Sequence, residues 1–221
     1  MNAANEGLLG GGGIDGAMNQ AGGPVLHHAR QALPVLNPHD PPSNHIRCHT
    51  GGAKMTVGGN LASTFCIHAV GPNYNRYSTS TEPDALLHSA YQQALQLAHA
   101  SDLCTIGFAL LSASIFRGRK SLKHVLMIAV KSCIDTVLSF KQDKPLEIHL
   151  VGYTDTEINV LEFVLNGARS YCQEQQENRN SSNSKSSKSS NKTMVLPPPP
   201  QVQQPPPPPP QIQALPPQVQ A

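Results

Sequence analysis

The chain has 221 residues, of which 38% are hydrophobic and 14% are charged, with a net charge of +2. So weak a positive charge gives no argument for nucleic-acid binding, and no apolar run is long enough to span a membrane. Because the N-terminus also lacks the basic start and apolar core of a signal peptide, we expect an intracellular protein of the cytoplasm or nucleus.

The first predicted feature is a loop of four consecutive glycines, Gly10–Gly13, which a helical pattern follows at once. Such a run is unfavourable inside a strand or helix, because glycine loses the most backbone freedom on folding. Its bare N–H groups at a helix N-terminus favour a phosphate. Asn5 and Asp15 bracket the glycines and are the candidates for chemistry. Alternatively, Asn5 is a turn residue and Asp15 a carboxylate in the first turn of a helix.

Two other glycine motifs fit this stretch less well. Gly11–Gly16 matches the dinucleotide pattern G-x-G-x-x-G, which requires a strand directly before it and an acidic residue about 20 positions later. Only Leu8-Leu9 precede the glycines, and Asp40 lies in a proline-containing loop. The Gly-Lys-Ser/Thr of a Walker P-loop is absent. The sequence therefore favours a different kind of phosphate loop.

Further along the chain, strand patterns alternate with helical ones. Helices are predicted over 14–33, with a bend at Gly22-Gly23-Pro24, and over 84–100, 121–138 and 154–170, the last with Thr154 or Asp155 as N-cap. Strands are predicted over 53–57, 64–70, 104–111 and 146–151, and a connecting loop over 37–52. The uninterrupted apolar run 104–111 indicates a strand buried on both faces. This alternation predicts an α/β fold with helices on both faces of a sheet.

A second ligand loop is predicted at Ser112–Gly118, between the strand 104–111 and the helix 121–138. Ligands of such folds bind beyond the carboxyl ends of strands, in loops that enter helices. The small residues Ser112, Ala113 and Ser114 leave the backbone accessible there.

Cysteines and histidines give no metal-site pattern. The cysteines, at positions 48, 66, 104, 133 and 172, are odd in number and unpaired in spacing, which favours reduced core cysteines. His27-His28 and His45/His49 lack further ligands and are expected at the surface. His68, between apolar residues of a strand, is expected to be a hydrogen-bonded core histidine rather than a catalyst. We predict neither a metal nor a cofactor.

The composition changes near residue 171, after which Gln, Asn, Ser, Lys and Pro dominate. We therefore expect one domain over 1–171 and a disordered tail over 172–221. The proline runs between 197 and 217 favour polyproline II, which could dock on SH3, WW or profilin-like grooves. A low-complexity spacer is the alternative.

Several ordered motifs together resemble the macro domain family over about residues 2–166. The resemblance rests on the segments Asn2-Ala3-Ala4-Asn5, Leu8–Gly13, Ile14-Asp15-Gly16, Thr50–Thr56, Ile67–Pro72 and Leu110–Phe116. It implies a three-layer α/β/α fold with a mixed central sheet. It also implies a ligand, ADP-ribose, either free or attached to protein.

The resemblance further implies roles for individual residues. Asn5 would contact the distal ribose, and Asp15 would position or activate water there. The phosphates would lie between the two loops, on residues Gly10, Gly11, Gly12, Gly13, Ile14, Ser112, Ala113, Ser114 and Ile115. Phe116 would cover the ribose, or else anchor its loop in the core. Tyr153, which follows the last strand, matches an aromatic against adenine by position alone.

Three departures from the family pattern carry expectations. Ser114 stands where relatives have glycine, and would cost about 1 kcal/mol if that position needs a positive φ. Asn19 replaces a histidine common in the hydrolytic cellular branch. The strands that precede the Asn-Ala-Ala-Asn segment in relatives are missing, so we expect a truncated gene product or a weakened domain with unpaired sheet edges.

Two classes of function remain open at this point. One is an enzyme that removes mono-ADP-ribose from acidic side chains or deacetylates O-acetyl-ADP-ribose. The other is a non-catalytic reader of ADP-ribosylated proteins, or an inactive fragment.

Overall fold

The computed structural model describes residues 1–140 and 145–186, with side chains in the last helix given as far as residue 170. The strands are β1 (Asn2–Ala3), β2 (Ala53–Val57), β3 (Phe65–Ala69), β4 (Thr105–Ala109) and β5 (Glu147–Val151). The helices are α1 (Gly13–Gln31), α2 (Thr81–Ala100), α3 (Leu122–Ser139) and α4 (Asp155–Ser186), with short 3-10 turns η1 (Pro42–Asn44), η2 (Tyr74–Arg76) and η3 (Ile115–Arg117).

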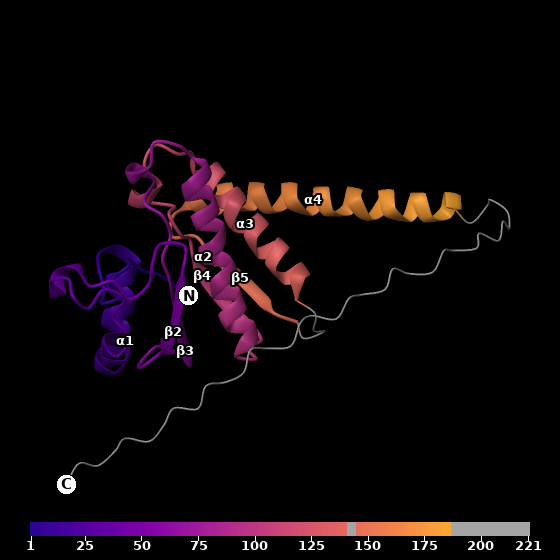
Figure 1. Cartoon of the computed structure of the whole chain (residues 1–221). Coiled ribbons are helices and arrows are strands. Elements are labelled where there is room, and N and C mark those ends of the chain that lie inside the picture. Colours follow the sequence, from indigo (N-terminus) through magenta and orange to yellow (C-terminus); the bar gives the residue numbers. More distant parts are fainter. Residues whose placement is uncertain (141–144, 187–221) are drawn as a thin grey trace, which may run out of the picture. The chain divides into compact units, whose positions relative to one another are not determined.

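The strands form a mixed three-stranded sheet in the order β1-β3-β2 and a parallel two-stranded sheet, β4-β5. β1 pairs in parallel with β3, β2 pairs antiparallel with β3, and β4 pairs in parallel with β5. Met1 connects the two sets, because its carbonyl accepts from the Ala109 N–H at 3.3 Å and its amine donates to the Gly107 carbonyl. Helices α1 and α2 lie on opposite sides of β2 and β3 (Figure 1). The predicted three-layer α/β/α architecture with a mixed sheet is confirmed.

Most predicted elements are present, with three differences. β1 was not predicted, because two residues carry no readable periodicity. Helix α2 begins at Thr81 rather than Asp84, and α4 continues to Ser186 rather than ending near Ser170. At the start of α4, the Thr154 hydroxyl accepts from the Glu157 N–H at 3.2 Å, and the Glu157 carboxylate accepts from the Thr154 N–H at 3.1 Å. This reciprocal cap agrees with the predicted N-cap at 154 or 155.

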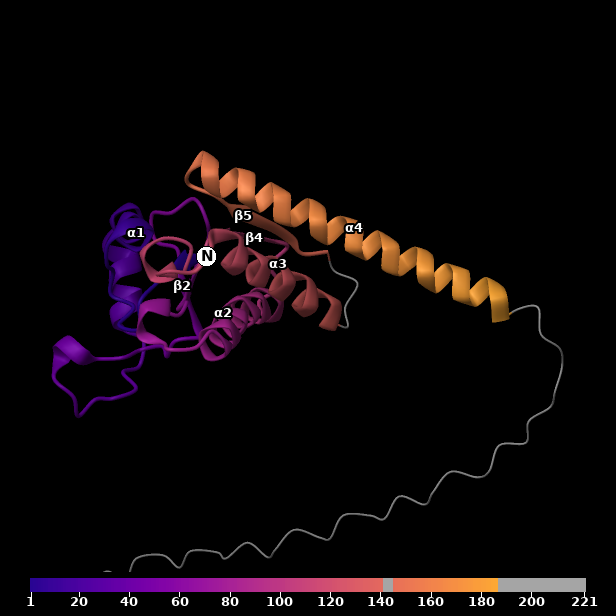
Figure 2. The ribbon, with the colours of Figure 1, turned by 90° about the horizontal axis from the view of Figure 1, so that it is seen from above.

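The prediction that the strand 104–111 is buried on both faces is wrong. Ile106 and Phe108 are buried, whereas Thr105 and Gly107 on the other face are exposed. The neighbouring strand β5 alternates in the same way. Among the described elements, α3 and α4 contact β5 on the buried side (Figure 2), and α1 packs on β1 and β2. A continuous apolar run therefore does not distinguish one covered face from two.

The main core lies between the sheet and α2. Buried residues of α2, among them Leu87, Tyr91 and Leu95, recur at helical spacing and contact the sheet. The Tyr91 ring packs on Phe108 with centroids 5.4 Å apart. The Tyr91 hydroxyl accepts from the Leu111 N–H at 2.9 Å. The core thereby holds the backbone that leads into the predicted second loop.

The cysteine prediction holds for three of the four described side chains. Cys48, Cys66 and Cys133 are buried and form no disulfide, and burial raises the pKa of Cys133 to about 12, so its thiol stays protonated. Cys104 is exposed and directly precedes β4. Cys172 lies beyond the described side chains.

The residues Met1–Asn178 form one compact unit. The predicted boundary at 171/172 stays a prediction. The proline runs lie outside the described residues. None of the helices in the described part has the length and hydropathy needed to cross a membrane.

Candidate functional site

The glycine loop enters α1 without any side-chain cap. Gly12 is the N-cap. Gly10 and Gly13 have positive φ values of 106° and 59°, which residues other than glycine rarely adopt. The Asn5 side chain shapes this loop: its Oδ1 accepts from the Gly7 N–H at 3.1 Å, and its Nδ2 donates to the Gly10 carbonyl at 2.8 Å. Asn5 therefore organises the loop whatever else it contacts.

The second loop is held by different bonds. Ser112 has a φ of 54°, and its buried hydroxyl donates to the Pro72 carbonyl at 2.7 Å. Ser114 has a φ of −110°, so the strain expected from serine at that position does not arise. Ser112, two positions earlier, is the non-glycine residue of this loop with a positive φ.

The two loops line one cavity of about 300 Å³. Its wall contains these predicted residues: Asn5, Gly11, Gly12, Gly13, Ile14, Asp15, Ser112, Ala113, Ser114, Ile115 and Phe116. Phe116 is 37% exposed rather than buried in the core. Gly10 and Tyr153 are outside the wall, and Tyr153 is 96% exposed. The cavity wall also contains five residues that the sequence patterns did not predict: Ala3, Ala4, Gly71, Leu110 and Leu111.

Asp15 forms a buried ion pair that the sequence did not reveal. Its Oδ1 accepts from Arg30 Nη2 at 2.7 Å and from Asn2 Nδ2 at 2.8 Å. Arg30 is fully buried and Asp15 is 4% exposed. Oδ2 is also buried and meets no donor within the described residues. A Cβ at Gly11 would lie 3.3 Å from Oδ2 and 3.0 Å from Asn5 Nδ2, so both side chains converge on Gly11.

This ion pair depends on a break in α1. In a straight helix, two residues 15 positions apart are about 22 Å from each other, farther than an arginine side chain reaches. Gly23 interrupts the helix with φ 65° and ψ −164°, next to Pro24, so that the second half turns back toward the first. The predicted bend is therefore confirmed, and its consequence is the contact between Asp15 and Arg30.

A neutral histidine supports the same network. His68 is fully buried, with Nδ1 3.1 Å from Asn2 Nδ2 and Nε2 2.9 Å from the Thr56 hydroxyl. Burial, followed by the charge of Arg30, lowers the pKa of His68 to about 3. His68 is thus the hydrogen-bonded core histidine that the sequence predicted.

We predict that His68 makes the fold sensitive to acid. Its pKa is about 3 when folded and 6.5 ordinarily, so the unfolded chain binds more protons between these values. The contribution of neutral His68 to the free energy of unfolding is therefore fully present above pH 6.5. It is lost as the pH falls toward 3, by up to about 1.4 kcal/mol per pH unit. Urea unfolding between pH 4 and 7 measures this slope. His68→Gln should make it shallower, and an identical slope in that variant would contradict the assignment.

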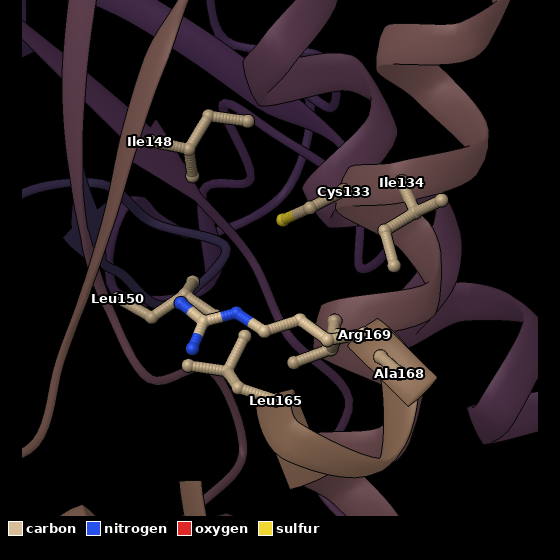
Figure 3. A pocket seen from close by; sticks show the side chains of 8 residues that line it. Cys133, Ile134, Ile148, Leu150, Leu165, Ala168 and Arg169 are labelled. Carbon is tan, nitrogen blue, oxygen red and sulfur yellow. The ribbon is translucent and has the colours of Figure 1, made fainter. Parts of the chain in front are cut away.

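A second cavity, of about 330 Å³, lies between α3, β5 and α4. Figure 3 shows its apolar wall, which includes Cys133, Ile148 and Leu165, with the Arg169 side chain extending toward Leu150. It lacks the convergent polar groups of the loop cavity. No cluster of three potential metal ligands occurs in the described part of the chain.

The loop cavity combines two chemical features. Backbone N–H groups at the start of α1 favour an anion, and phosphate is the usual occupant of such a glycine-flanked helix N-terminus. A carboxylate oxygen lies next to the same loop. The cavity is thus suited to a phosphate ester that also carries hydroxyl groups near Asp15.

Comparisons with known proteins agree on one family. A family model described as Macro domain matches residues 1–125. The chain is 39% identical over 155 residues to a macro domain-containing protein of Xanthomonas axonopodis pv. citri, covering 70% of this chain and 80% of that one. It is 34% identical over 155 residues to an O-acetyl-ADP-ribose deacetylase of Escherichia fergusonii, with the same two coverages.

Another relative, a macro domain-containing protein of Vibrio parahaemolyticus, is 39% identical over 116 residues, which are 52% of this chain and 62% of that protein. Among solved structures, the Oceanobacillus iheyensis macrodomain with ADP superposes with a TM-score of 0.65 and 31% identity, covering 77% of this chain and 83% of that one.

Proposed function

Because the chain belongs to the macro domain family, we propose that its loop cavity binds ADP-ribose and that the site hydrolyses an ester at the terminal ribose. One observation carries the proposal: two loops far apart in sequence meet around a single cavity with Asp15 in its wall. A solved relative holds ADP, and another is named for deacetylating O-acetyl-ADP-ribose, which supports both parts.

In this proposal, the diphosphate lies between the glycine loop and Ser112–Phe116. The N–H groups of Gly12 and Gly13 lie at the start of α1, where they can donate to the diphosphate. No protein atom lies within 4 Å of the place that a Cβ would occupy at either residue, so the space beside the loop is open. Phe116 and the more exposed Ile115 form the apolar side of the same cavity. This arrangement leaves the ribose end of the ligand near Gly11, where Asn5 and Asp15 converge.

Asp15 then acts on water through Oδ2. For an O-acetyl substrate, the water oxygen forms a bond to the acetyl carbon, and the bond between that carbon and the ribose oxygen breaks. Acetate leaves, and the ribose oxygen receives a proton. Asp15 orients the water and accepts its proton, a role in which a carboxylate contributes about 10²–10⁴-fold to the rate.

Asp15→Asn tests this role, because the amide oxygen can still accept from Arg30. We expect kcat for O-acetyl-ADP-ribose or a mono-ADP-ribosylated protein to fall at least about 100-fold, while ADP-ribose affinity falls by no more than about tenfold. Acetate or ADP-ribose release gives kcat, and isothermal titration gives the affinity. Undiminished turnover would remove Asp15 from the mechanism. An absence of binding heat in the wild type at high ADP-ribose concentration would remove the whole proposal.

A non-catalytic reader is the second candidate, and the Asn5 contacts favour it. Both ends of the Asn5 amide bond the loop's own backbone, which leaves only one Nδ2 hydrogen for a ligand. An Asn5 side chain that is held by the backbone keeps the loop in place for binding a ligand. ADP-ribose binding without turnover of either substrate by the wild type would support the reader and exclude the hydrolase.

A further inference from the structure

Two donors bind the same oxygen of the Asp15 carboxylate, and the other oxygen has no donor among the described residues. Arg30 Nη2 and Asn2 Nδ2 both donate to Oδ1, at 2.7 and 2.8 Å. Oδ2 lies on the side of Gly11 and has no donor among the described residues. A buried carboxylate oxygen without a partner is costly, so its retention at the wall of a ligand cavity points to a bound group as the missing donor.

We propose that Arg30 is a positioning residue, supported by Asn2 and His68, which holds Asp15 so that Oδ2 faces the terminal ribose of the ligand. The inference rests on the proposed function. It assigns the orientation of the site to a residue that lies in the last turn of α1 and does not line the cavity.

Arg30 is suited to this task because it binds the loop and the carboxylate together. Its Nε donates to the carbonyl of Leu8, a residue with a φ of 57°, and its Nη1 lies 3.4 Å from Asn19 Oδ1. The rigid planar guanidinium fixes the Asp15 carboxylate relative to the start of the glycine loop. A lysine would keep the charge but could not present donors in this fixed fork.

Asn2 and His68 fix the second donor. Thr56 can donate to the Val57 carbonyl at 3.1 Å, so the His68 Nε2–H donates to the Thr56 oxygen and Nδ1 remains an acceptor. As an acceptor, Nδ1 must bind the amide nitrogen of Asn2 and not its oxygen. The same nitrogen donates to Asp15, so His68 fixes which way the Asn2 amide is turned. The neutral state of His68 maintains this orientation over the physiological pH range.

Isothermal titration with ADP-ribose and with ADP, which lacks the terminal ribose, tests the inference. We expect Arg30→Lys to reduce the preference for ADP-ribose over ADP about tenfold, with ADP affinity within about twofold of the wild type. Asp15→Asn should cause a similar loss, and the double variant should lose no more than Asp15→Asn alone. The exposed Arg169→Gln is the matched control and should preserve both affinities.

Each other outcome contradicts the inference. A parallel fall in both affinities would show that Arg30 only maintains the fold, and additive losses would show that it does not act through Asp15. If Arg30→Lys fails to fold, Asn2→Ser removes one donor without unpairing the buried charge and should show the same selective loss. A wild type that binds both ligands equally overturns the positioning role alone, whereas one that binds neither overturns the proposed function as well.

Discussion

Asp15→Ala should lower the free energy of unfolding by about 3–5 kcal/mol, because it leaves the buried Arg30 guanidinium without its counter-charge. Both side chains of this pair are almost completely buried, with 0% and 5% of their surfaces exposed. A loss of this size is a large part of the total stability of a domain, and corresponds to a fall in Tm of roughly 6–20 °C. Urea unfolding and calorimetry at neutral pH would measure it.

Asp135→Ala is the matched control for this change. Asp135 also pairs with a cation, Lys131, but on the surface of α3, with its side chain 41% exposed. Such pairs contribute at most about 1 kcal/mol, so this variant should unfold close to the wild type. Equal losses in the two variants would contradict the energetic importance of the buried pair. Asp15→Ala/Arg30→Met, which removes both charges, should recover much of the lost stability.

Gly16→Ala should weaken ADP-ribose binding about 100-fold, the equivalent of losing two hydrogen bonds to charged phosphate oxygens. A Cβ at position 16 would lie 2.4 Å from the Gly11 carbonyl oxygen, a separation that real side chains do not show. The obstacle is backbone rather than a flexible side chain, so the glycine loop itself must move. Its N–H groups would then no longer point at the ligand.

Gly167→Ala provides the comparison for Gly16→Ala. Gly167 is also inside a helix, α4, but a Cβ there meets nothing within 4 Å. Alanine is the better helix former by up to about 1 kcal/mol, so this variant should be slightly more stable and bind ADP-ribose as the wild type does. Isothermal titration of the two variants side by side makes the comparison. Unchanged affinity in Gly16→Ala would show that the loop tolerates the displacement.

Local patterns predicted the parts of the fold that depend on neighbouring residues. The strand 53–57, the break at Gly22-Gly23-Pro24 and the cap at Thr154 were all readable, because each is governed by side-chain periodicity or backbone freedom within a few residues. The two-residue strand β1 was not readable, since it is defined by its pairing with β3. Whether the strand 104–111 has one or two covered faces likewise depends on where distant helices pack.

The candidate site divides in the same way. Glycine content, small residues and the order of motifs located both loops along the chain, and the cavity contains all but two of the predicted residues. Arg30 gave only a weak signal: it follows Leu26 by four positions and so shares the buried face of α1. Tyr153 matched by position alone, and the structure leaves it exposed to solvent.

By itself, the sequence determined the helices, the strands β2 to β5, the two loops and the family, because these depend on local conformational preference and on motif order. Only the tertiary structure decided how Asp15 is held. The Gly23 break brings Arg30 back to the first turn of α1, and the β1–β3 pairing places Asn2 beside His68. Such contacts join residues far apart in sequence, so no local pattern encodes them, yet they determine which oxygen of the Asp15 carboxylate has no donor among the described residues.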